Sequence, residues 1–85
     1  MKNIIVTLLL IEFCFSKTVS ISGSIINDEG KPSRKAEVTL FGIDDLPISL
    51  VKTNRKGRFE FSDINPDYYY LVANHPEEGM VRIKI

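Results

Sequence analysis

The stretch that decides the fold runs from residue 53 to residue 73 and reads TNRKGRFEFSDINPDYYYLVA. In it Phe59 and Phe61 alternate with polar residues, which is the period of two expected of a strand with one buried face. The segments 54–57 and 63–67, on either side, are rich in the Asn, Asp, Gly and Pro that form turns. The stretch therefore predicts two turns and two strands, and no residue in it is a plausible catalyst.

The sequence beyond residue 17 continues this pattern. Strands separated by turn-forming residues are expected at residues 19–25, 36–41, 48–53, 58–62, 68–74 and 80–85. No segment of this part carries apolar residues at helical spacing over three turns. Short strands with Gly- and Pro-rich turns are typical of all-β folds, so we expect a small antiparallel β-sandwich of six to seven strands.

The first 16 residues have the layout of a secretory signal peptide. Lys2 precedes an apolar run at 4–11, and Ser16 stands before the expected cleavage site. This run is shorter than the roughly 20 residues that span a bilayer, and the alternative is an N-terminal strand or helix of the core. We therefore expect a signal peptide at 1–16 and an extracytoplasmic domain at 17–85. Its compartment would be the endoplasmic-reticulum lumen in a eukaryote, or the periplasm or exterior in a bacterium.

Charged and metal-binding residues give little indication of chemistry. The chain has 11 basic and 11 acidic residues, and its one basic cluster, at 52–58, is expected to be a solvated hairpin tip rather than a nucleic-acid site. His75, the only histidine, lacks partners at metal-ligand spacing and is expected to be a solvated turn residue. Asp44 and Asp45 lack the spacing of a calcium loop. We expect a non-enzymatic protein without catalytic residues, metal or cofactor.

The tyrosine run is the main candidate for binding. On a strand, Tyr69 points opposite to its neighbours, so Tyr69 is expected in the core and Tyr68 and Tyr70 on the outer face. Tyrosine is enriched at protein interfaces, which makes Tyr68 and Tyr70 a candidate interface. The alternative is that they only stabilise the sheet through cross-strand contacts. An unpaired edge strand that accepts a strand from another chain is a separate candidate.

Residues 18–74 resemble the carboxypeptidase regulatory-like domains, which have a transthyretin-like (prealbumin-like) β-sandwich. The resemblance rests on an ordered set of motif residues, which are Gly23, Gly30, Pro32, Ala36, Gly57, Phe59, Phe61, Pro66 and Tyr69. The family usually has glycine after the proline, and we expect Asp67 to take its place at positive φ. The family also usually has seven strands, so a further strand is expected from a partner or from a truncated part of the chain.

The layout is similar to that of one family in particular, subunit 7 of the endoplasmic-reticulum membrane protein complex. The similarity lies in an N-terminal signal peptide followed at once by one sandwich, and in the segments 70–76 and 81–85. It implies a lumenal accessory subunit whose partners are subunits of that complex. The resemblance to the wider family leaves open a carbohydrate- or peptide-binding module of a secreted or outer-membrane receptor or peptidase system, with Tyr68 and Tyr70 making the contact.

Overall fold

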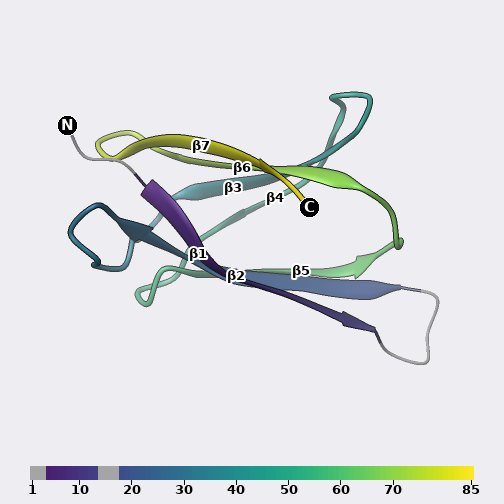
Figure 1. The fold of residues 1–85 in the computed structure, drawn as a ribbon, viewed down its shortest axis with the longest axis horizontal. Helices are drawn as coiled ribbons and strands as arrows, with labels where there is room; N and C mark the ends of the chain where they lie inside the picture. The colour runs from purple at the N-terminus through teal and green to yellow at the C-terminus, as the bar shows by residue number, and fades with distance from the viewer. Residues whose placement is uncertain (1–3, 14–17) are drawn as a thin grey trace.

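A computed structural model describes residues 4–13 and 18–85 as strands joined by turns, arranged in two antiparallel sheets (Figure 1). The strands are β1 (Ile4–Phe13), β2 (Val19–Asn27), β3 (Glu37–Gly42), β4 (Pro47–Lys52), β5 (Arg58–Ile64), β6 (Tyr69–His75) and β7 (Gly79–Lys84). One sheet has the order β1-β2-β5 and the other the order β4-β3-β6-β7. The prediction of an all-β, antiparallel fold is confirmed.

All six strands expected after residue 18 are present near their predicted positions, and residues 4–13 add β1. Strand β1 pairs with β2 from Ile4 opposite Asn27 to Phe13 opposite Val19. The expected cleavage site after Ser16 lies outside the described residues, as does Cys14. The signal peptide therefore stays a prediction. No helix in the described parts of the chain is long and apolar enough to cross a membrane.

The core lies between the two sheets and is built from alternate residues of four strands. Strand β2 alternates between buried and half-buried positions along its whole length, as its sequence predicts. Opposite it, Val38, Leu40 and Leu71 are fully buried on β3 and β6. The rings of Phe59 and Phe61 meet edge to face with their centroids 5.9 Å apart. The alternation predicted from the sequence thus defines which face of each sheet is inside.

Gly57 joins the β4–β5 turn to β2. Its φ is +72°, and its carbonyl accepts a hydrogen bond from the Ile25 N–H at 2.7 Å. A β-carbon at this position would come closer than 3.0 Å to the Ile25 carbonyl oxygen, a separation that real β-carbons essentially never show. The left-handed conformation favours glycine at this hairpin, and the close approach to β2 gives a second reason for it.

The positive φ expected at Asp67 is wrong. Asp63 has this conformation instead, with φ 56°. Strand β5 carries one more residue than β2 at this point, because Phe61 pairs with Ile21 whereas Ile64 pairs with Val19. A left-handed residue accommodates such a bulge. The Asp67 carboxylate accepts a hydrogen bond from the next backbone N–H at 2.7 Å, so the turn before β6 does not need a glycine there.

Candidate functional site

Exposed apolar side chains gather at one end of the molecule. Among residues 18–85, the exposed large hydrophobic side chains are Ile43, Leu46, Ile48, Leu50, Tyr68 and Met80. Four of these six, namely Ile43, Leu46, Ile48 and Tyr68, line a single hollow of about 420 Å³. The hollow lies between the β3–β4 and β5–β6 connections, and we call it the loop-end hollow.

The β3–β4 turn fixes one wall of the loop-end hollow. Gly42 and Leu46 close the turn through a hydrogen bond from the Gly42 N–H to the Leu46 carbonyl at 3.0 Å. Asp44 lines the hollow and accepts the Leu46 N–H at 3.2 Å. Asp45 has a positive φ of 63° and points to Arg82, 2.8 Å from its guanidinium. The turn therefore directs two adjacent carboxylates to different surroundings.

Tyr68 forms the aromatic wall of the hollow from just before β6. Its side chain is 69% exposed, and the carboxylate of Asp67 lies beside it in the lining. The ammonium of Lys84 is 6.0 Å from the centre of the Tyr68 ring and is not part of the lining. The hollow thus combines an exposed ring, aliphatic walls and the carboxylates of Asp44 and Asp67.

Tyr70, the other candidate interface residue, lies on the outer face of the four-stranded sheet and is half-buried. The Arg82 guanidinium lies 4.2 Å from the centre of its ring and also pairs with Asp45. A second, smaller hollow of about 290 Å³ beside Arg82 is lined by Phe41, Val72 and Met80. Tyr70 is therefore covered by the guanidinium of Arg82, whereas the more distant Lys84 leaves the Tyr68 ring 69% exposed.

Tyr69 is buried, whereas Tyr68 is exposed and Tyr70 is half-buried, as the alternation predicts. Its hydroxyl donates a hydrogen bond to the backbone carbonyl of Asn65, across the corner that leads into β6. Burial raises the pKa of the Tyr69 hydroxyl, and the negative charge of Asp67 raises this pKa further. The ring thus anchors the turn that presents Tyr68.

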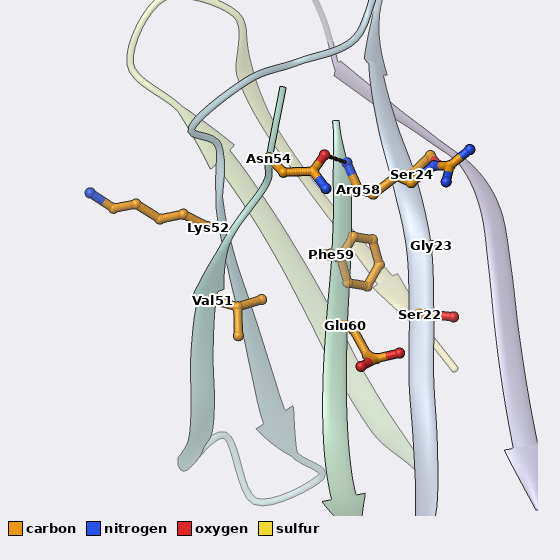
Figure 2. Close-up of a pocket in the computed structure, with 9 residues that line it drawn as sticks. All are labelled: Ser22, Gly23, Ser24, Val51, Lys52, Asn54, Arg58, Phe59 and Glu60. Carbon is orange, nitrogen blue, oxygen red and sulfur yellow. Dashed lines mark hydrogen bonds between the residues drawn. The ribbon is translucent and has the colours of Figure 1, made fainter. Parts of the chain in front are cut away.

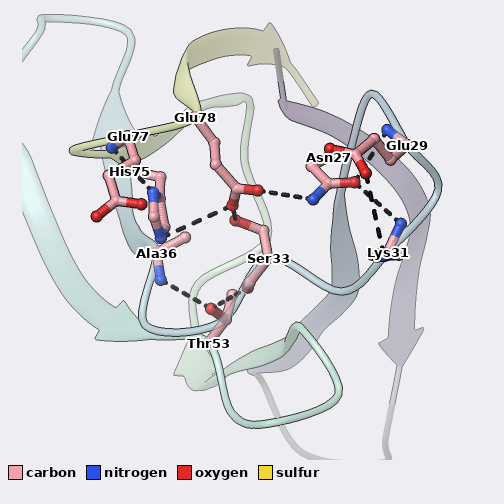
Figure 3. A network of polar contacts seen from close by, with 9 residues as sticks. All are labelled: Asn27, Glu29, Lys31, Ser33, Ala36, Thr53, His75, Glu77 and Glu78. Carbon is pink, nitrogen blue, oxygen red and sulfur yellow. Dashed lines mark hydrogen bonds and ion pairs between the residues drawn. The ribbon is translucent and has the colours of Figure 1, made fainter. Parts of the chain in front are cut away.

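A buried polar network lies at the other end of the sheets (Figure 3). Glu78, at the β6–β7 turn, accepts hydrogen bonds from the Asn27 amide and the Ser33 hydroxyl, both at 2.7 Å. His75 Nε2 lies 3.7 Å from the same carboxylate, and the His75 side chain is only 16% exposed. The expectation of a solvated His75 is therefore wrong, because the β6–β7 turn brings the Glu78 carboxylate, three residues later, next to the ring.

This network supports the fold at the junction of two turns. Ser33 is fully buried and donates to the glutamate rather than to the histidine, so it is not placed as a nucleophile. Thr53 extends the network by donating to the Ser33 carbonyl at 2.6 Å and accepting the Ala36 N–H at 2.9 Å. In residues 18–85 every buried side-chain polar atom has a hydrogen-bond partner, and no three His, Cys, Asp or Glu side chains are grouped to hold a metal.

A cleft of about 790 Å³ runs along the edges of β4 and β5 (Figure 2). Lys52 points away from β5, and the Arg58 side chain runs across β2, so the two cations do not converge. Among the described strands, β5 pairs with β2 alone. The Ile25 N–H bonds to the Gly57 carbonyl, and in an antiparallel pair the positions that bond to the partner strand alternate with positions that do not. By this alternation the backbone N–H and carbonyl of Glu60 point to the open side. The cleft is thus an open sheet edge whose two cations, Lys52 and Arg58, do not converge on one site.

No family model matches the chain, and no curated protein or solved structure matches it either. The loop-end hollow is therefore interpreted from its own geometry.

The sequence indicated Tyr68 but missed the other walls of the hollow. Ile43 and Leu46 lie between the strands expected at 36–41 and 48–53, on either side of the acidic pair Asp44-Asp45. Two large aliphatic residues in a short polar turn could have indicated an exposed apolar patch, because loop residues generally lie at the surface. Their approach to Tyr68 depends on the pairing of β3 with β6.

Proposed function

We propose that this protein is a non-enzymatic interaction module that binds a partner protein through the loop-end hollow. The observation that carries the proposal is the gathering of Ile43, Leu46, Ile48 and Tyr68 around one hollow. A soluble domain that exposes a contiguous apolar patch generally uses it for contact. Tyrosine is also among the residues that dominate binding energy when a partner excludes water from them.

The fold version of this proposal is a carboxypeptidase regulatory-like, transthyretin-like β-sandwich. It is supported by the two facing sheets and by the positions of the motif residues. Gly57 and Gly30 both have positive φ, Phe59 and Phe61 face the core, and Tyr69 closes the corner before β6.

The most concrete version is a lumenal accessory subunit of the endoplasmic-reticulum membrane protein insertion complex, similar to its subunit 7. The support is the signal-peptide layout of residues 1–16, the sandwich directly after it, and the similarity of segments 70–76 and 81–85. In this version the partners are other subunits of that complex, and the protein is extracytoplasmic.

A carbohydrate- or peptide-binding module is the second candidate, and the composition of the hollow favours it over an enzyme. The exposed Tyr68 ring offers a flat surface for a sugar, and Asn65 and Asp67 beside it offer hydrogen-bonding groups. Binding of an oligosaccharide by the isolated protein, with chemical shift changes at Tyr68, would favour this candidate over a protein partner.

Site-specific photocrosslinking tests the main proposal. A photoreactive phenylalanine analogue replaces Tyr68 in the full-length protein expressed in its own cells, and the same analogue replaces Arg55 on the exposed β4–β5 turn as a control. We expect crosslinks from position 68 to subunits of one membrane complex and none of these from position 55. Equal crosslinking from both positions, or no crosslinked protein from position 68, contradicts the proposal.

The compartment is tested separately by sequencing the N-terminus of the mature protein. Cleavage after Ser16 gives a chain that begins at Lys17 and lacks β1, which leaves the β2 edge without its partner strand. An intact N-terminus on protein recovered from the cytosol contradicts the signal peptide and leaves β1 as a permanent strand of the sheet.

A further inference from the structure

We infer that the loop-end hollow receives a lysine or arginine side chain of the partner protein. This inference rests on the proposed function and specifies the chemistry of the group that is bound. The two observations behind it are the charge of the hollow and the apolar character of its walls.

The charge of the hollow is negative. Asp44 and Asp67 line it, and no lysine or arginine of residues 18–85 does. Within residues 18–85 both carboxylates accept hydrogen bonds from backbone N–H groups, Asp44 from Leu46 and Asp67 from Tyr68. Asp45 differs, because its carboxylate is paired with Arg82 outside the hollow. A partner cation would therefore find two carboxylates that pair with no cation of residues 18–85, since Lys84 lies at the Tyr68 ring outside the lining.

The walls suit the stem of a long cationic side chain. Lysine and arginine bury their aliphatic chains along apolar surface while the charged head stays near water or a counter-ion. Ile43, Leu46 and Ile48 offer such a surface, and the hollow is open at the side of the exposed Tyr68 ring. A guanidinium or ammonium at this ring also gains a cation–π contact. Apolar walls with an acidic rim thus match one side chain with two distinct parts.

Other occupants fit less well. An anionic group would be repelled by both carboxylates, and a purely aliphatic side chain would leave them uncompensated. A second copy of this chain could present Arg34 or Lys35, which line a separate hollow beside the buried Glu78 network at the other end of the molecule. Such head-to-tail contacts would produce open chains rather than a closed dimer, which an experiment on protein size distinguishes.

The test is an NMR titration of the full chain with two matched peptides. The first is acetyl-Leu-Arg-Ile-Lys-Leu-amide, and the second has glutamine in place of both cations. We expect the cationic peptide to shift the backbone amides of Ile43, Leu46 and Tyr68, and to bind several-fold more tightly than the glutamine peptide. The difference should shrink as the salt concentration rises, because the carboxylates are exposed.

Two double variants make the test specific. Asp44→Asn with Asp67→Asn removes the charges and keeps an oxygen acceptor for each backbone N–H, and it should weaken the cationic peptide about fivefold, the factor given by two exposed ion pairs. Asp28→Asn with Glu77→Gln removes two exposed charges elsewhere and should change binding less than twofold.

Each outcome bears on a different statement. Equal binding of the two peptides, or an unchanged affinity in the Asp44/Asp67 variant, overturns the inference. If position 68 still crosslinks to a partner, the proposed function stands. Failure of both the titration and the crosslinking overturns both. Sedimentation also detects assemblies of many copies of the protein. If they form and the Asp44/Asp67 variant suppresses them, the group bound in the hollow belongs to a second copy of this chain, and the inference as stated is overturned.

Discussion

Replacement of Gly57 by alanine probes the contact that holds the β4–β5 turn against β2. A β-carbon there would meet the carbonyl oxygen of Ile25 at less than 3.0 Å, and it would lie 3.1 Å from the Ser33 nitrogen. Both neighbours are backbone atoms, so no side chain can rotate away. The backbone of the turn must move, and the hydrogen bond from the Ile25 N–H to the Gly57 carbonyl stretches with it.

Gly30 provides a matched control in the same chain. Its φ is +79°, close to that of Gly57, but a β-carbon at Gly30 would have no heavy atom of the described residues within 4 Å apart from its two chain neighbours. The strain of a left-handed alanine, about 1–2 kcal/mol, applies to both variants, and so does the gain of about 0.4–1 kcal/mol from a stiffer unfolded chain. Gly30→Ala should therefore lower the free energy of unfolding by about 1 kcal/mol.

Gly57→Ala adds the loss of backbone hydrogen bonds at the displaced turn, each worth about 1 kcal/mol. The bonds at risk are the one that Gly57 accepts and the one from the Ser33 N–H to the Ile25 carbonyl, at 2.7 and 2.9 Å. The expected total is about 3 kcal/mol, a large part of the roughly 4–13 kcal/mol expected for a domain of this length.

Urea unfolding followed by tyrosine fluorescence or circular dichroism measures both variants. With a slope near 1 kcal/mol/M, typical of a small protein, the midpoint should fall by about 3 M for Gly57→Ala and about 1 M for Gly30→Ala. Equal shifts for the two variants would refute the reasoning, because they would mean that the close approach of Gly57 to β2 adds nothing to the backbone strain.

Three further changes test the polar and aromatic contacts. Glu78→Gln places an amide group against one of the two buried donors at this site and should cost about 1–3 kcal/mol in urea unfolding, whereas Glu77→Gln, at the exposed neighbour, should stay within about 0.5 kcal/mol. Tyr69→Phe removes the hydroxyl that bonds the β5–β6 turn and should cost about 1 kcal/mol. Because the pKa of Tyr69 is raised in the folded state, its contribution is complete below pH 10.0 and is lost as the pH rises through the folded pKa. From pH 8 upward the free energy of unfolding should therefore fall more steeply in the parent than in Tyr69→Phe. Parallel curves would contradict the raised pKa of Tyr69. Arg82→Gln removes the cation above Tyr70 and should cost less than about 1 kcal/mol, since both partners are partly exposed; a larger loss would show that Arg82 is part of the folded core.

The alternation of residues was enough to predict which side chains enter the core. Phe59, Phe61 and Tyr69 were expected inside, and all three are buried. A strand has a side-chain period of two, so this information is local and does not depend on which strands pair. Turn signals are equally local: residues 54–57 were expected to form a turn, and Gly57 at its end has a positive φ.

Features that depend on how strands pair could not be predicted from the local sequence. The left-handed residue was expected at Asp67 from a family pattern, but it is Asp63, where β5 carries an extra residue against β2. His75 was expected to be solvated but is mostly covered, for a similar reason. Its covering carboxylate, Glu78, is held by Asn27, which is 51 residues away in the chain.

The sequence by itself determined an all-β chain, the inward face of each strand after residue 18, and Tyr68 as an exposed aromatic residue next to a buried one. The tertiary structure decided which loops meet. It brought Ile43 and Leu46 of the β3–β4 turn beside Tyr68, and it covered Tyr70 with Arg82. The physical reason is that a period of two is set by the geometry of one strand, whereas a hollow is set by the order and register of strands far apart in sequence.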